Sequence, residues 1–168
     1  VMNIKKVRVD KEGTGMGWGA VYAQYLESMD QIGEQGNGLS VSRQLYKGDE
    51  ALNESAPLKV GDKITVRLTV KADRDMDFVQ IKDDRAACME PLQAVSGFRW
   101  SNGLGYYQAT KDASTQFFID QMRKGTYVIE YQVYVNRTGE YQTGIATVQS
   151  AYAPEFGGHT GGYRVMVE

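Results

Sequence analysis

The chain has 168 residues, 42% of them hydrophobic, and is therefore long enough to bury the core of an ordinary domain. Its 19 basic and 21 acidic residues nearly balance, which predicts no cationic face for nucleic acid or anionic lipid. A single cysteine excludes an internal disulfide, and no apolar run is long enough to span a membrane. Glycine and tyrosine are abundant, with 19 and 11 residues, and this balance favours β-structure.

The amino-terminal part predicts strands at 4–9 and 17–29, before the glycine-rich stretch GEQGNG at 33–38. Clustered glycines are typical of turns and connections rather than of strand interiors. We therefore predict a boundary in this stretch. Residues 1–36 would form additional strands, and residues 37–168 would form one domain.

Two later segments show the clearest pattern, KITVRLTVK at 63–71 and TYVIEYQVYV at 126–135. Apolar and polar residues alternate in both, which predicts antiparallel strands with one face in a core and one in water. The inward residues are Ile64, Val66, Leu68 and Val70 in the first segment, and Tyr127, Ile129, Tyr131, Val133 and Val135 in the second. Further strands are predicted at 39–46, 77–82, 93–100, 105–110, 114–120, 140–150 and 162–167.

Turn sequences separate the predicted strands: KVGD at 59–62, SNGLG at 101–105, RKGT at 123–126 and NRTGE at 136–140. The one helical alternative is IDQMRK at 119–124, which is equally compatible with a turn. Many short strands at such spacing predict an all-β fold, an antiparallel immunoglobulin-like β-sandwich with extra amino-terminal strands.

Few residues in the sequence are suited to catalysis or to metal binding. His159 lies in GGHTGG, and a glycine-flanked loop positions a proton-transfer group poorly. One histidine and one cysteine leave a zinc site short of its usual ligands, and the acidic DRDMD at 73–77 lacks the spacing of an EF-hand. We therefore expect no enzymatic activity, no catalytic residue, no metal and no cofactor.

Four aromatic residues allow two interpretations: Trp18, Trp100, Tyr106 and Tyr107. In a sandwich such residues commonly form core and cross-strand pairs. If exposed, they would instead form a platform for a sugar. The alternative function is therefore a glycan- or protein-binding β-sandwich module of a cell-envelope protein, and burial of these rings would exclude the glycan interpretation.

Several motifs in a fixed order resemble the carboxyl-terminal part of bacterial α2-macroglobulin-family proteins. GLSVSRQLY at 38–46 resembles the first strand of the final domain, and LKVGD at 58–62 leads into the alternating strand. A segment ending in Glu90-Pro91 follows, then TGEY at 138–141 and YAPE at 152–155 before the closing strand. The resemblance covers residues 38–168. Residues 1–36 resemble strands that return from the thioester-type domain through its connecting β-domain.

This resemblance implies the terminal macroglobulin-like domain of a large protease-trapping protein of the periplasm or cell envelope, commonly a lipoprotein. Such a domain does no chemistry. It packs against the thioester-type domain and stabilises the uncleaved state. The implied partners are the upstream thioester-type and macroglobulin-like domains of the same chain, and target proteases through the full-length protein.

The resemblance also assigns candidate site residues. In thioester-bearing relatives a Met-Tyr-x-Pro-Glu loop lies against the thioester and keeps water from it. Tyr152 matches the tyrosine of that loop, Pro154 stiffens it, and Ala151 stands where relatives carry methionine. These three residues are candidates for sheltering a thioester or for a domain interface. Tyr152 is then expected to be at least partly exposed here.

Cys88 begins the sequence Cys-Met-Glu-Pro, which resembles the Cys-x-Glu-Gln motif of a thioester. However, Pro91 has no side-chain amide with which the thiol could condense, and in relatives the thioester lies in an upstream helical domain. We predict that Cys88 is a buried apolar residue. The alternative is a reactive thiol activated by Arg85.

Overall fold

The computed structural model describes residues 8–20, 22, 33–53 and 56–168, and these ranges contain strands from Gln35 onward and no helix. The strands are β1 (Gln35–Asn37), β2 (Leu39–Lys47), β3 (Glu50–Ala51), β4 (Lys63–Ala72), β5 (Met76–Asp84), β6 (Met89–Pro91), β7 (Gly97–Ser101), β8 (Leu104–Thr110), β9 (Ser114–Met122), β10 (Gly125–Val135), β11 (Gly139–Gln142), β12 (Ala146–Ser150), β13 (Gly157–His159) and β14 (Arg164–Val167). The described ranges thus offer no helix suited to crossing a membrane.

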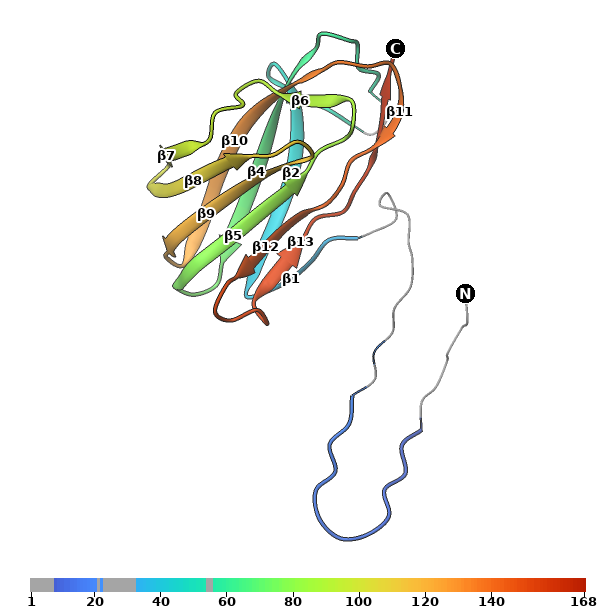
Figure 1. The fold of residues 1–168 in the computed structure, drawn as a ribbon, viewed down its shortest axis with the longest axis vertical. Coiled ribbons are helices and arrows are strands. Elements are labelled where there is room, and N and C mark those ends of the chain that lie inside the picture. The colour runs from blue at the N-terminus through green and yellow to red at the C-terminus, as the bar shows by residue number, and fades with distance from the viewer. Residues whose placement is uncertain (1–7, 21, 23–32, 54–55) are drawn as a thin grey trace.

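The strands lie in two facing layers (Figure 1). The first layer has the order β6-β10-β4-β2, and the second has the order β12-β5-β9-β8-β7. Strands β1 and β13 join the layers along one edge, so hydrogen bonding continues from β2 round to β12. The named strands pair antiparallel, and β11 and β14 form a separate small ladder. The predicted antiparallel immunoglobulin-like sandwich is confirmed.

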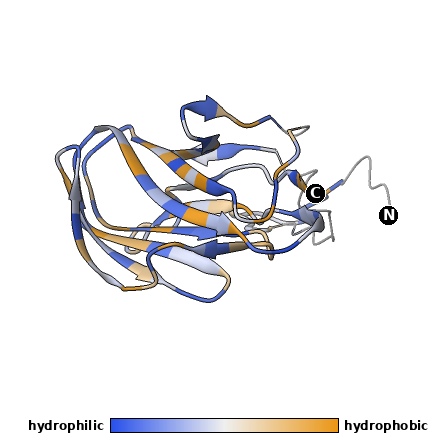
Figure 2. Cartoon of the chain, turned by 90° about the horizontal axis from the view of Figure 1, so that it is seen from above, coloured by the Kyte–Doolittle hydropathy of each residue, from blue (hydrophilic) through white to orange (hydrophobic). Residues whose placement is uncertain are grey.

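The alternation predicted in β4 and β10 is confirmed as the centre of the core. Ile64, Val66, Leu68 and Val70 are each at most 2% exposed, and the inward side of β10 is buried except for the half-buried Tyr127. The two strands pair over their length, with Tyr127 opposite Val70. Hydrophobic and hydrophilic segments alternate along the strands in Figure 2. Each buried aliphatic side chain contributes about 1.5–3 kcal/mol.

The amino-terminal strands were predicted wrongly as far as they are described. Residues 8–9, 17–20 and 22 are in no strand, and the remainder of 4–9 and 17–29 lies outside the described residues. Met16, Trp18 and Tyr22 are between 86% and 90% exposed. A strand needs a partner ladder, and no described residue supplies one here.

Other boundaries also differ. The predicted strand 140–150 is two strands, which are interrupted at 143–145. Within the interruption Gly144 lies so close to β5 that an added Cβ would collide with the Asp84 side chain. The helical alternative at 119–124 was wrong, since β9 continues as far as Met122. The turn at 101–105 is confirmed as a tight hairpin, in which Asn102 and Gly103 adopt φ values of 50° and 79°.

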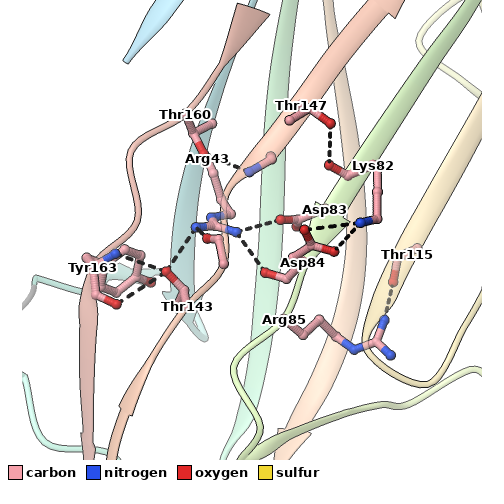
Figure 3. Close-up of polar contacts among 12 residues, drawn as sticks. Arg43, Lys82, Asp83, Asp84, Arg85, Thr115, Thr143, Thr147, Thr160 and Tyr163 are labelled. Carbon is pink, nitrogen blue, oxygen red and sulfur yellow. Dashed lines mark hydrogen bonds and ion pairs between the residues drawn. The ribbon is translucent and has the colours of Figure 1, made fainter. Parts of the chain in front are cut away.

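One buried polar cluster crosses the core (Figure 3). The Arg43 guanidinium on β2 donates to the Asp83 carboxylate on β5 at 2.5 Å, and their side chains are 4% and 1% exposed. Arg43 also donates to Thr143 Oγ1 at 3.0 Å and to the Gly144 carbonyl at 2.5 Å. The Tyr131 hydroxyl on β10 donates to the other Asp83 oxygen at 2.6 Å. The cluster therefore ties both layers to the segment that leads into β12.

Candidate functional site

The candidate site is the loop between β12 and β13, residues 151–156. Its base is closed by the Ser150 amide, which donates to the Phe156 carbonyl at 3.0 Å. Inside the loop, the Phe156 amide donates to the Ala153 carbonyl at 2.9 Å, which forms a tight turn around Pro154. The loop is therefore folded by its own backbone rather than extended.

Side chains from neighbouring strands fix the far side of the loop. Asn37 Nδ2 donates to the Glu155 carbonyl at 2.7 Å, and Gln149 Nε2 donates to the Pro154 carbonyl at 3.2 Å. The Phe156 ring packs against the core, with the Arg74 guanidinium 4.6 Å from its centroid. The loop is thus held on β1, β12 and the β4–β5 turn.

Tyr152 stands on this braced loop with 78% of its surface exposed. Its one ring contact among the described residues is Phe78, at 5.0 Å between centroids and in an edge-to-face arrangement. The prediction that Tyr152 is at least partly exposed is confirmed. Because the backbone beneath the ring is fixed, the ring is preorganised to contact a partner.

Phe78 supports the loop from β5 in a strained conformation. Its φ is +54°, a left-handed value that bulky residues rarely adopt and that costs about 1–3 kcal/mol. The Phe78 carbonyl accepts a hydrogen bond from the Ala151 amide at 2.8 Å. The strain therefore coincides with the two contacts that position residues 151 and 152.

The three predicted site residues lie together on this loop. Ala151 is exposed and is held by its amide, Pro154 is exposed at the turn, and Tyr152 projects outward. Sequence reasoning missed Phe78, Arg74 and Asn37, which position them. One signal for Phe78 was present: two adjacent apolar residues, Phe78 and Val79, interrupt the alternation of β5.

Cys88 is fully buried, which confirms its predicted place in the core. Arg85 does not approach it as an activator, because its guanidinium is bound to Thr115 Oγ1 and to the carbonyls of Lys111 and Asp112. Burial raises the pKa of the Cys88 thiol, so the thiolate is disfavoured at neutral pH. These contacts argue against the reactive-thiol alternative.

We expect native Cys88 to react with a disulfide reagent at pH 8 roughly 100-fold more slowly than in denaturant, because reaction requires local opening. The denatured chain is the control, since Cys88 is the only cysteine. Cys88→Ala should cost about 1 kcal/mol of unfolding free energy. Rapid native labelling with a midpoint below the ordinary thiol pKa would contradict burial.

His159 lies on β13 and is half-buried, with Nδ1 3.1 Å from the Thr160 carbonyl oxygen. It is not paired with a second titratable group in the described ranges. Among the residues described, no group of three or more His, Cys, Asp or Glu side chains is placed to hold a metal ion.

Of the four aromatic residues that could form either core pairs or a sugar platform, some are exposed and others are buried. Trp18 and Trp100 are exposed, at 90% and 75%, Tyr107 is half-buried, and Tyr106 is buried. Burial therefore does not exclude a surface platform, although Tyr106 belongs to the core.

Comparison with known proteins shows the family. Residues 38–155 match the family described as the bacterial alpha-2-macroglobulin MG10 domain. The match extends over more than half of the chain, and the chain therefore belongs to this family of macroglobulin-like domains. A curated relative, circularly permutated Ras protein 2 of Dictyostelium discoideum, is 28% identical over an alignment of 166 residues that covers 95% of this chain and 4% of the relative.

Solved structures show the same fold. A mutant of Salmonella alpha-2-macroglobulin matches with a TM-score of 0.69 and 19% identity, covering 81% of this chain and 10% of that one. Escherichia coli alpha-2-macroglobulin from domain MG7 to its C-terminus matches with a TM-score of 0.67 and 17% identity, covering 80% and 24%. The chain thus spans a small fraction of the proteins that it resembles.

Proposed function

We propose that this chain is the non-catalytic, carboxyl-terminal macroglobulin-like domain of a protease-trapping protein of the periplasm or cell envelope, anchored as a lipoprotein. Residues 37–168 form the domain, although β1 extends it to Gln35 and Gly36, which pair with β13. The rest of residues 1–36 would pair as strands of the connecting β-domain in the parent protein. Its partners are the upstream thioester-type and macroglobulin-like domains of the same chain, and proteases are trapped by the whole protein. The family match supports this role, as does the structural similarity to Escherichia coli alpha-2-macroglobulin activated by porcine elastase.

The observation that carries the proposal is the exposed Tyr152 ring on a braced loop. An isolated folded domain gains little from a tyrosine held outside its core, whereas a partner domain would bury it. In the proposed protein Tyr152 lies against the thioester-type domain, and Ala151 and Pro154 line the same contact. The contact stabilises the uncleaved state, and bait cleavage shifts that two-state balance.

The exposed apolar residues before the sandwich support the same arrangement. Met16, Trp18 and Tyr22 are apolar residues two or four positions apart, and all are exposed. Such spacing suits one face of a strand. In the proposed protein these residues pair with the remaining strands of the connecting β-domain, which buries that face.

Tyr152→Ala in the parent protein tests the contact. We expect the stability of this domain to change by less than about 0.5 kcal/mol, since the ring is exposed. Limited proteolysis should cleave the parent roughly fivefold faster, because one aromatic contact contributes about 1 kcal/mol. Tyr152→Phe should behave like the unchanged protein.

Tyr134→Ala is the matched control, because Tyr134 is also an exposed tyrosine but lies on β10 of the opposite layer. It should leave the opening rate unchanged. Identical opening rates for Tyr152→Ala and the unchanged parent, at equal domain stability, would refute the proposed interface.

A further inference from the structure

A second surface, separate from the Tyr152 loop, carries aromatic rings on the outer side of the second layer. Phe98 and Trp100 on β7 are 82% and 75% exposed, and Phe118 on β9 is 39% exposed. The half-buried Tyr107 on β8 lies between them, directly opposite both Phe98 and Phe118 in the strand register. One row of rings thus crosses three strands. We call these four residues and their surroundings the aromatic face.

The other layer shows that this pattern is not general. The outward residues of β4 are polar throughout: Lys63, Thr65, Arg67, Thr69 and Lys71. A wet sheet face ordinarily has that composition. The outward aromatic residues of the first layer, Tyr46 on β2 and Tyr134 on β10, are separated by this polar strand. A continuous row of rings across three strands therefore indicates a binding surface rather than ordinary surface composition.

The rings are held in defined orientations. Trp100 lies across Gly105 of β8, where an added Cβ would be 3.0 Å from two of its ring carbons. The six-membered ring of the indole thus lies beside the strand backbone at Gly105, and with 75% exposure most of the ring surface is open to solvent. Phe98 and Tyr107 meet edge to face at 5.1 Å. Strands hold these groups, so little order is lost on binding.

The aromatic face is hollowed and has polar groups at its rim. The hollow has a volume of about 650 Å³ and is lined by Phe98, Arg99, Trp100, Tyr107, Phe118 and Asp120. The volume lies within the range of small-ligand sites. Asp120 is exposed, and its carboxylate forms no hydrogen bond or ion pair with any described residue. Gln80, opposite Phe118 on β5, adds an exposed amide.

We propose that the aromatic face binds a β-linked glycan, with a pyranose ring stacked on the open side of Trp100. The electron-rich face of an aromatic ring attracts the weakly positive C–H groups of a sugar. Equatorially substituted, β-linked pyranoses present such flat C–H faces, while their hydroxyls reach sideways. The Asp120 carboxylate accepts from those hydroxyls, and the Gln80 amide donates to them.

The features of the face favour this ligand class over others. A polyanion would meet a free carboxylate in a chain of net charge −2. A protein partner commonly buries about 800 Å² on each side, with charged residues scarce at the centre. Here the open Trp100 ring, an unpaired carboxylate and a hollow of ligand size lie together, a combination that suits a few sugar units. The proposal does not depend on Tyr152 or on protease trapping.

Tryptophan fluorescence tests the proposal directly, because the chain has only Trp18 and Trp100. In the variant Trp18→Phe, all tryptophan emission reports Trp100. We expect saturable quenching or a blue shift on titration with cellotetraose or chitotetraose, and a weaker response to the α-linked maltotetraose. Calorimetry on the unchanged chain should give the same affinity.

Matched variants separate binding from folding. Trp100→Ala should weaken binding by at least roughly tenfold, as expected for loss of one stacking contact. Asp120→Asn, which keeps the shape of the side chain, should weaken it by roughly threefold or more, and Tyr134→Ala should leave it unchanged. Circular dichroism confirms that each variant is folded.

The proposal would be overturned if neither β-linked tetrasaccharide gave a saturable response up to roughly 10 mM. It would also be overturned if a folded Trp100→Ala variant bound as tightly as the unchanged chain. If the isolated chain binds no tetrasaccharide and Trp100 becomes protected only within the parent protein, the face is a domain interface and the proposal is wrong. None of these results would affect the separate proposal for the Tyr152 contact.

Discussion

Asp83→Ala is expected to lower the free energy of unfolding by about 3–5 kcal/mol, because it removes one partner from a buried ion pair. The Arg43 guanidinium, 4% exposed, would remain in the core without its carboxylate. The Tyr131 hydroxyl would lose its acceptor as well. The Arg43 charge would keep its hydrogen bonds to Thr143 and Gly144 but would be buried without a counter-charge, and the Tyr131 hydroxyl would be buried without an acceptor. Denaturant unfolding followed by circular dichroism measures the change.

Glu130→Ala is the control for Asp83→Ala. Its partner Arg67 lies at the same distance of 2.5 Å, but both side chains are more than 40% exposed. Exposed pairs contribute about 0–1 kcal/mol. If Asp83→Ala costs no more than Glu130→Ala, the cluster does not hold the two layers together.

The contribution of the same cluster to stability at alkaline pH depends on Tyr131. Burial, together with the adjacent Asp83 carboxylate, raises the pKa of Tyr131 well above its ordinary value. The neutral phenol is thus favoured in the folded state. The stability that it contributes is present below the unfolded-state pKa of about 10 and is lost as pH rises above that value.

The sandwich was predictable where one strand face is apolar and the other polar. β4 and β10 satisfy this condition over their whole lengths, so alternation alone identified both strands and their inward residues. β1 and β13 were missed because QGN and GGH carry no apolar alternation. Their pairing comes from close backbone approach, which sequence periodicity does not record.

The candidate loop was located only through the family resemblance of YAPE at 152–155. Nothing in its local pattern distinguishes an outward Tyr152 from an inward one. The orientation is set by Phe78 and by Asn37, which are 74 and 115 positions away in the sequence and meet the loop only in the folded chain. Likewise, the aromatic face depends on the register that aligns Phe98, Tyr107 and Phe118.

A second large loss of stability is expected from a substitution at the edge where β1 and β13 join the two layers. Gly158 on β13 lies opposite Gly36 on β1, and a Cβ added at Gly158 would be 2.7 Å from the carbonyl oxygens of both Gln35 and Leu39. These are backbone atoms, so a strand must shift to admit a methyl group. Gly158→Ala should therefore cost about 2–3 kcal/mol, despite the smaller gain from restricting the unfolded chain.

Gly97→Ala provides the comparison for Gly158→Ala, since Gly97 is also in a strand but its nearest neighbouring atom is a side-chain nitrogen of Arg99 at 4.0 Å. It should leave stability unchanged or raise it by up to about 1 kcal/mol. Both variants are measured by denaturant unfolding. Because β13 also ends the Tyr152 loop, Gly158→Ala should increase protease cleavage within 151–156, whereas Gly97→Ala should not. Equal unfolding midpoints for the two variants would show that the layers are not joined through close contact of β1 and β13.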